Sequence, residues 1–377
     1  MNFTLSPEQR MLQKVVREFA ENEVEPIAAE IDQTHRFPRE TFEKMAEVGF
    51  TGINIPKEFG GAGADELSKS IVVTELAKKC ASTAVIFSVH TLFNYIITTF
   101  GNEDQKNKYL KKIASSPAMG GFALTEPNAG SDAGGVKTTA VVVGDNYIIN
   151  GAKCFITNGS SDFFVVICST APEKGVKGLS AIVVEKGTPG MSIGKVEDKM
   201  GISGSETVEL IFDNCIVPRE NLLSKEGDGF KVAMVGLDSG RIRIASQALG
   251  IAEGAHAEAV KYLKDRVQFG KPLAKQQGLQ WYIAEMSTRV EAARGLIYHA
   301  ADVKQKGEPV SKIAAMAKLF ASETAEYVTS QALQIHGGYG YMKDYPLERM
   351  YRDARITKIY EGTSEVQKIV IAREVLK

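Results

Sequence analysis

The sequence has few cysteines and none of the clusters that build disulfide frameworks or zinc sites. Its 377 residues include four cysteines, and no two of them are spaced as Cys-x-x-Cys: Cys80, Cys154, Cys168 and Cys215. The five histidines are scattered and include no His-Glu-x-x-His motif, so no metal site is expected. Cysteines without this pairing also favour a reducing compartment.

The sequence has no excess of charge of either sign. Its 45 basic residues face 46 acidic ones, which leaves a formal charge of −1. A nucleic-acid-binding surface depends on a basic excess, so we do not expect nucleic acid as a partner. Residues 80–102 contain no Asp, Glu, Lys or Arg, but they do carry many Ser, Thr, Asn and His side chains. We therefore expect this segment to be a helix buried in protein rather than a membrane span.

Several common nucleotide-binding and hydrolase motifs are missing. The chain has no Gly-x-Gly-x-x-Gly, no Walker loop and no Gly-x-Ser-x-Gly, so Rossmann, P-loop and α/β-hydrolase folds lose their usual support. The first residues run directly into Ser6-Pro7-Glu8-Gln9, which is typical of a capping box with proline in the first turn. No signal or transit peptide precedes this box, so we expect a cytoplasmic protein. The mature form of a mitochondrial matrix protein is the alternative.

The hydrophobic period changes twice along the chain. From Ser6 to about Ser116 apolar residues recur at helical spacing, and from about Gly229 to the end they do so again. Between these parts lie short β-rich runs with turn signals at Asn150-Gly151 and Asn158-Gly159. Strands without intervening helices favour a barrel or sandwich over βαβ units. The order predicts an α+β fold, mainly α: an N-terminal helical domain (1–118), a central antiparallel β-barrel or sandwich (119–226) and a C-terminal four-helix bundle (227–377).

One acidic residue near the C-terminus stands in an unusual turn. Ser364 followed by Gln367 predicts a capping box and a helix that starts at about residue 365. Glu361 then lies outside this helix, and Gly362 beside it lets a ligand or a backbone approach closely. From this stretch alone, Glu361 is either a functional carboxylate or an ordinary acidic residue in a capped turn.

Further motifs along the chain resemble the acyl-CoA dehydrogenase family, in order and at family spacing over essentially its whole length. The stretches are 122–132 (FALTEPNAGSD), 154–159 (CFITNG), 266–270 (RVQFG), 334–341 (QIHGGYGY), 351–356 (YRDARI) and 359–363 (IYEGT). The short-chain (butyryl-CoA) branch is the most similar, notably through 201–205 (GISGS) and 238–242 (DSGRI).

This resemblance implies an FAD enzyme that introduces a trans double bond between the α and β carbons of a short-chain acyl-CoA. Glu361 matches the family's catalytic base, which takes the α-proton while the β-hydrogen leaves as hydride to flavin N5. The Glu361 backbone N–H and a ribityl hydroxyl of FAD would bind the thioester oxygen, as in an oxyanion hole. In isovaleryl- and long-chain-type relatives a glutamate near position 240 is the base; Gly240 stands there in this chain.

The resemblance also assigns binding residues. Phe155 stands where several relatives have Trp and is expected to cover one face of the flavin. The expected FAD-binding residues are Leu124, Thr125, Ser131, Phe155, Ile156, Thr157, Arg266, Phe269, Gln277, Gln334, Gly337, Gly338, Thr363 and Glu365. The expected substrate-binding residues are Ser131, Asp238, Arg241, Tyr360 and Gly362. For each set the alternative is structural, such as a turn at the domain entry, a core aromatic or a salt-bridged helix surface.

The resemblance implies partners as well. Arg266, Gln277 and residues 334–338 resemble groups that bind FAD from a neighbouring subunit, so a homo-oligomer, by family habit a tetramer, is expected. Electron-transfer flavoprotein is the expected electron acceptor. The alternatives are a short branched-chain dehydrogenase, an acyl-CoA oxidase, which is usually a longer chain, and a nucleic-acid-binding relative, which would carry a basic extension.

Overall fold

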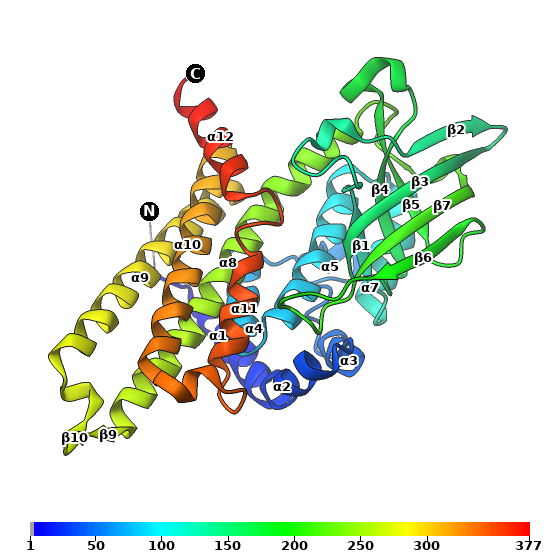
Figure 1. Cartoon of the computed structure of the whole chain (residues 1–377). Coiled ribbons are helices and arrows are strands. Elements are labelled where there is room, and N and C mark those ends of the chain that lie inside the picture. Colours follow the sequence, from blue (N-terminus) through cyan, green and yellow to red (C-terminus); the bar gives the residue numbers. More distant parts are fainter. Residues whose placement is uncertain (1–3) are drawn as a thin grey trace.

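The computed structural model describes residues 4–377, and helices make up the first and last parts of the chain (Figure 1). The predicted cap at Ser6 is confirmed: its Oγ accepts from the Gln9 backbone N–H at 3.2 Å, and Gln9 Oε1 accepts from the Ser6 N–H at 2.9 Å. The N-terminal helices are α1 (Pro7–Phe19), α2 (Glu25–Thr34), α3 (Arg39–Glu47), α4 (Glu66–Lys79), α5 (Ala81–Phe100), α6 (Glu103–Gln105) and α7 (Lys111–Ser115).

The middle of the chain forms one eight-stranded sheet on one side of the helices, at the upper right in Figure 1. Its strand order is β6-β7-β3-β2-β4-β5-β8, and β1 pairs with β4. The strands are β1 (Gly120–Ala123), β2 (Thr139–Val143), β3 (Asn146–Thr157), β4 (Phe163–Ser169), β5 (Leu179–Glu185), β6 (Met191–Val196), β7 (Thr207–Pro218) and β8 (Leu222–Leu223).

Two details of the sheet differ from the sequence expectation. The pairing is not wholly antiparallel, because β4 runs parallel to β1 (Gly120 opposite Phe163) and to β2 (Thr139 opposite Ser169). Asn150-Gly151 is not a turn but part of β3, at a shift of register against β7. A Cβ on Gly151 would lie 2.6 Å from Thr138 Oγ1, so glycine is required there by close packing inside the sheet.

The C-terminal part is built on three long helices. α8 contacts α10 along much of its length, and α10 also packs on α9, α11 and α12. A small hairpin joins α8 to α9 at the end far from the sheet (Figure 1). The elements are α8 (Gly229–Asp265), β9 (Val267–Gln268), β10 (Lys271–Pro272), α9 (Gln277–Gln305), α10 (Ser311–His336), α11 (Leu347–Ile356) and α12 (Ser364–Val375).

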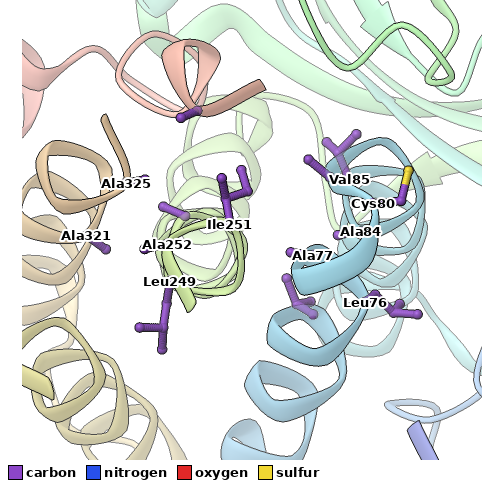
Figure 2. Packing of buried hydrophobic residues seen from close by; sticks show 14 of the residues in the cluster. Leu76, Ala77, Cys80, Ala84, Val85, Leu249, Ile251, Ala252, Ala321 and Ala325 are labelled. Atoms are coloured by element: carbon purple, nitrogen blue, oxygen red, sulfur yellow. The ribbon is translucent and has the colours of Figure 1, made fainter. Parts of the chain in front are cut away.

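The N-terminal and C-terminal helices share one hydrophobic core. Figure 2 shows α8 side chains between Ala321 and Ala325 of α10 on one side and residues of α4 and α5 on the other. The helices approach closely at Gly250 and Gly254, where an added Cβ would lie 2.4 Å from Thr74 O and 2.5 Å from Lys78 O of α4. α8 is therefore held rigidly between the two helical parts.

The uncharged stretch found in the sequence forms α5. By length and composition it could cross a membrane, but 78% of its apolar window is buried inside the protein. The expectation of a helix buried in protein is confirmed, and α5 lies between the sheet and α8, with contacts to β1 and α8. Several polar groups of α5 find partners inside the fold; for example, Asn94 Nδ2 donates to Thr51 O at 2.9 Å. This position lets α5 border a site between the sheet and α8.

Candidate active site

The turn that carries Glu361 joins α11 to α12 and is held from two directions. Glu361 has a φ of 53° and Gly362 a φ of 90°, so both lie in the left-handed region. Gln367 Nε2 donates to the Gly362 carbonyl at 2.8 Å and to the Glu361 carbonyl at 3.2 Å. Lys318 Nζ of α10 donates to the same Gly362 carbonyl at 2.8 Å. These bonds fix the strained turn in one conformation.

The predicted capping box at Ser364 is wrong in its details. The N-cap is Thr363, whose Oγ1 accepts from the Val366 N–H at 3.3 Å, and α12 starts at Ser364. Gln367 does not reach back to a cap N–H, because its side chain points to the carbonyls of the preceding turn. Ser364 Oγ is buried without a hydrogen-bond partner among residues 4–377. The turn is thus held by bonds across its backbone rather than by a box.

The Glu361 carboxylate points at α8, against Gly240. A Cβ on residue 240 would lie 2.3 Å from Glu361 Oε2. This oxygen is buried and has no hydrogen-bond partner within the described part of the chain. A buried carboxylate oxygen without a donor is costly and therefore stands ready to accept a proton.

The surroundings of Glu361 increase the affinity of its carboxylate for a proton. Burial raises the pKa of Glu361 above its ordinary value, and the positive charges of Arg243, Arg241 and Lys318 offset part of that rise. Burial also lowers the pKa of Lys318 to about 7, against the attraction of Glu361. A carboxylate with a raised pKa is a stronger general base.

Tyr360 ties the same turn to the helices behind it. Its hydroxyl donates to Gln247 Oε1 of α8, and Gln247 Nε2 donates to Ala81 O of α5 at 2.9 Å. This chain of hydrogen bonds joins the turn, α8 and α5. Tyr360 therefore helps to position the turn that carries Glu361, independently of any contact with substrate.

Asp238 and Arg241, expected at the substrate, form an ion pair one turn apart on α8. Asp238 Oδ2 also accepts from Ser311 Oγ at 2.6 Å. Arg241 is buried, and its Nε has no partner among residues 4–377. The alternative of a salt-bridged helix surface is therefore correct in part, since Asp238 and Arg241 form an ion pair. The Arg241 Nε, however, remains available as a donor to a ligand.

Two segments expected at the flavin ring, 124–125 and 155–157, lie close together at the sheet. The segment at Leu124 and Thr125 is held by Lys153, whose Nζ donates to Leu124 O at 2.9 Å and pairs with Glu126 at 2.7 Å. Thr125 O accepts from the Cys154 N–H at 2.9 Å, next to Phe155. The loop and β3 are thereby fixed side by side.

Phe155 is the most prominent of these residues. It has a φ of 58° and lies at a register shift of β3, which turns its ring outward so that the residue is 64% exposed. The side chain of neighbouring Ile156 is buried in the sheet core, so it can offer only backbone groups to a ligand. Thr157 ends the strand, and the Asn158 amide after it donates to Ile86 O of α5 at 3.0 Å. Ser131 is exposed in the loop before β2.

A second set of expected FAD residues lies at the other end of α8. Arg266, Gly337 and Gly338 line a cleft of about 470 Å³. Phe269, at the tip of the β9–β10 hairpin, is 92% exposed. Gln277, at the start of α9, and Gln334, near the end of α10, are also exposed. α8 has 37 residues, about 55 Å at 1.5 Å per residue. Within one chain the structure therefore separates these residues from the sheet (Figure 1).

One charged residue of the site escaped the sequence reasoning. Arg243 of α8 is 3% exposed, and its charge acts on Glu361. The sequence did contain a signal for it: Arg241 and Arg243 stand in a stretch of α8 that consists mostly of small and apolar residues. No group of acidic, His or Cys side chains with metal-binding geometry occurs among residues 4–377.

Comparison with known proteins decides the family. Three domain families match the chain in order: the N-terminal (residues 6–117), middle (121–215) and C-terminal (227–376) domains of acyl-CoA dehydrogenases. The acryloyl-CoA reductase (NADH) of Anaerotignum propionicum is 59% identical over all of this chain and 96% of its own. The chain belongs to the acyl-CoA dehydrogenase family. The helix–sheet–helix fold class expected from the sequence is confirmed, as is the FAD dependence that members of this family share.

Two solved structures support the assignment over the full chain. The butyryl-CoA dehydrogenase of Megasphaera elsdenii is 45% identical with a TM-score of 0.98, and each chain covers 100% of the other. A chain described with the electron transferring flavoprotein of Acidaminococcus fermentans is 52% identical with a TM-score of 0.99, again over 100% of both. This acyl-CoA dehydrogenase is thus an oxidoreductase with short-chain relatives.

Proposed function

We propose that this acyl-CoA dehydrogenase oxidises a short-chain acyl-CoA to the trans-2-enoyl-CoA, with Glu361 as the base that removes the α-proton. The observation that carries the proposal is Glu361 Oε2, which is buried against Gly240 and has no hydrogen-bond partner among residues 4–377. Burial raises the pKa of this carboxyl, so proton transfer from a weakly acidic carbon becomes less unfavourable. The Glu361 backbone N–H is the proposed donor to the thioester oxygen.

The residues present fit FAD. Phe155 offers an exposed aromatic ring, and Ile156 and Thr157 follow it in β3. Leu124 and Thr125 lie beside this strand through the bond from the Cys154 N–H to Thr125 O, and Ser131 is exposed in the loop before β2. The bound flavin supplies the acceptor for the β-hydride. Thr363 and Glu365, at the start of α12, are proposed to face the cofactor from the helix side. Asp238, Arg241, Tyr360 and Gly362 are proposed to hold the substrate around the base.

The remaining cofactor residues support an oligomer. Arg266, Phe269, Gln277, Gln334, Gly337 and Gly338 lie at the far end of α8 from the sheet. A single FAD cannot contact both ends of a helix about 55 Å long. We therefore propose that these residues bind the pyrophosphate and adenosine of FAD held by a neighbouring subunit, in a tetramer.

Electron-transfer flavoprotein is the proposed acceptor, supported by the chain described with the electron transferring flavoprotein of Acidaminococcus fermentans. A second candidate is the reverse reaction, because the relative of Anaerotignum propionicum is named a reductase. The same residues serve both directions, since Glu361 would then return a proton to the α-carbon. We propose a cytoplasmic location for either.

The test is anaerobic reduction of the flavin in the purified holoenzyme by butyryl-CoA, followed as bleaching of its absorbance. Wild-type enzyme should bleach, while Glu361→Gln should retain FAD and bleach more slowly by roughly a thousandfold or more. Near-normal bleaching of the variant would assign the base to another residue. If acyl-CoA esters of every length tested leave the wild-type flavin oxidised, the proposed function is wrong.

A further inference from the structure

Arg243 is a buried cation beside the site whose charge acts on Glu361, but its hydrogen-bond donors have no role in the reaction described above. Its Nη2 donates weakly to Thr91 O of α5 at 3.4 Å, whereas Nε and Nη1 are buried without a partner among residues 4–377. Arginine carries five N–H donors and a permanent charge, so a buried guanidinium with unpaired donors is costly. A residue that only filled this space would be apolar. The unpaired donors point to a ligand.

The charges around Arg243 leave a positive excess. Lys69, Lys304 and Arg243 lie around the Tyr95 ring, at 5.9, 3.9 and 5.9 Å from its centre. Glu66 is the carboxylate of this group and is already paired with Lys69 at 2.6 Å, with Lys304 at 3.5 Å. These residues are here called the Tyr95 cluster. A second carboxylate, that of Glu361, also acts on Arg243, so three basic side chains stand against two carboxylates in this part of the interior.

Arg243 of the Tyr95 cluster lies on the side of α8 that faces Glu361. Arg243 follows Gly240 by three residues, so it projects from the same face of α8 on which the Glu361 carboxylate rests. Its bond to Thr91 spans from α8 to α5, the two helices that border the site. A substrate whose α-carbon lies at Glu361 can extend its acyl chain between them.

We propose that Arg243 binds a carboxylate at the distal end of the acyl chain, and that the preferred substrate is a short dicarboxylic acyl-CoA. This inference rests on the proposed function and names its substrate class. A carboxylate would accept from the free guanidinium donors and balance the positive excess of the Tyr95 cluster. An apolar chain end at the same place leaves the donors unpaired, which makes binding weaker.

The experiment compares two ligands that share one carbon skeleton. Glutaryl-CoA carries the distal carboxylate and valeryl-CoA does not. Their dissociation constants are measured by calorimetry on the FAD-loaded Glu361→Gln enzyme, in which turnover does not interfere. Glutaryl-CoA should bind about 10-fold tighter or more, and adding Arg243→Met should abolish this preference. Arg243→Lys, which keeps the charge but loses the planar fork, should retain part of it.

The matched control is Arg36→Met, which removes an exposed arginine paired with Glu30 and Glu40 far from the site. It should leave the glutaryl-to-valeryl preference unchanged. Retention of FAD and a thermal unfolding curve show that each variant is folded. In wild-type enzyme, bleaching of the flavin by valeryl-CoA and glutaryl-CoA is measured in parallel.

Two outcomes would overturn the assignment of Arg243. One is equal binding of both ligands before and after the Arg243→Met change. The other is an Arg243→Met variant that binds longer apolar acyl-CoA esters such as hexanoyl-CoA but keeps the wild-type ratio of glutaryl-CoA to valeryl-CoA dissociation constants. Arg243 would then only close the end of the pocket. If glutaryl-CoA binds preferentially through Arg243 but no acyl-CoA bleaches the flavin, the proposed function fails and the anion site stands. Bleaching by butyryl-CoA without a carboxylate preference refutes the anion site alone.

Discussion

A Cβ atom on residue 240 would lie 2.3 Å from Oε2 and 2.9 Å from Cδ of Glu361. Non-bonded carbon and oxygen atoms do not approach this closely, so the glycine leaves the space that the carboxylate occupies. For the same reason a glutamate at position 240 and the observed Glu361 could not coexist. The absence of a side chain in α8 is therefore part of the site.

Replacing Gly240 with alanine should displace the Glu361 carboxylate. We expect Gly240→Ala to slow flavin bleaching by butyryl-CoA roughly 100-fold, the usual cost of misplacing a reacting group by about 1 Å. Gly236→Ala, one turn earlier, is the matched control, because its Cβ would meet side-chain atoms alone, the nearest being the flexible end of Ile96 at 3.2 Å. It should bleach at nearly the wild-type rate. Equal rates for both variants would show that residue 240 does not place the base.

The Glu361 carboxylate should destabilise the folded protein at neutral pH. Burial raises the pKa of Glu361 in the folded state, so between about pH 4.3 and that raised pKa the folded state binds more protons than the unfolded state. The contribution of Glu361 to the free energy of unfolding is fully present below about pH 4.3. It is lost as the pH rises through the pKa of the folded state. Glu361→Gln should therefore unfold about 2 °C or more above wild type at pH 7.

The difference should shrink as the pH approaches 4. Thermal unfolding of both FAD-loaded proteins across this pH range checks the prediction. A Glu361→Gln variant that is less stable than wild type at pH 7 would mean that the carboxylate is stabilised in the fold instead.

Gln367 should control the turn that carries the base. Gln367→Leu keeps the volume but removes the donor to the Glu361 and Gly362 carbonyls. We expect a loss of about 1–3 kcal/mol in the free energy of unfolding and at least a several-fold slower bleaching. Lys368→Ala, at the exposed position next to it, should change neither quantity. An unaltered bleaching rate in Gln367→Leu would show that the turn keeps its conformation without the Gln367 hydrogen bonds.

Lys153 should be essential for the flavin side of the site. It is fully buried and pairs with Glu126 at 2.7 Å, while Glu126 also accepts from the Thr138 N–H at 2.9 Å. Lys153→Met leaves a buried carboxylate without its cation, which costs about 3–5 kcal/mol. Denaturant unfolding should show this loss, together with weaker FAD retention.

An exposed ion pair provides the comparison. Lys195 pairs with Glu197, but its side chain is 70% exposed. Lys195→Met should therefore change the free energy of unfolding by less than about 1 kcal/mol. If both lysine variants lost the same stability, burial of the Lys153 pair would not be the cause.

Features that depend on neighbours within a few residues could be predicted from the amino-acid sequence. Helical spacing, the cap at Ser6 and the turn at Asn158-Gly159 are set by local hydrogen bonds and by the period of apolar residues. The order of motifs was sufficient to recognise the family and to select Glu361 among 46 acidic residues. Local reasoning failed at Asn150-Gly151, where pairing with β7 overrides a strong turn signal.

Features that join residues far apart in the sequence could be found only in the folded protein. Gly240 meets the Glu361 carboxylate across 121 positions of sequence (361 − 240), and Gln367 turns to the carbonyls before its helix. Arg243 is an ordinary arginine in the sequence; its unpaired donors emerge only when α5 closes over it. The cost of burying a charge depends on which groups surround it in three dimensions, and no local pattern contains that information.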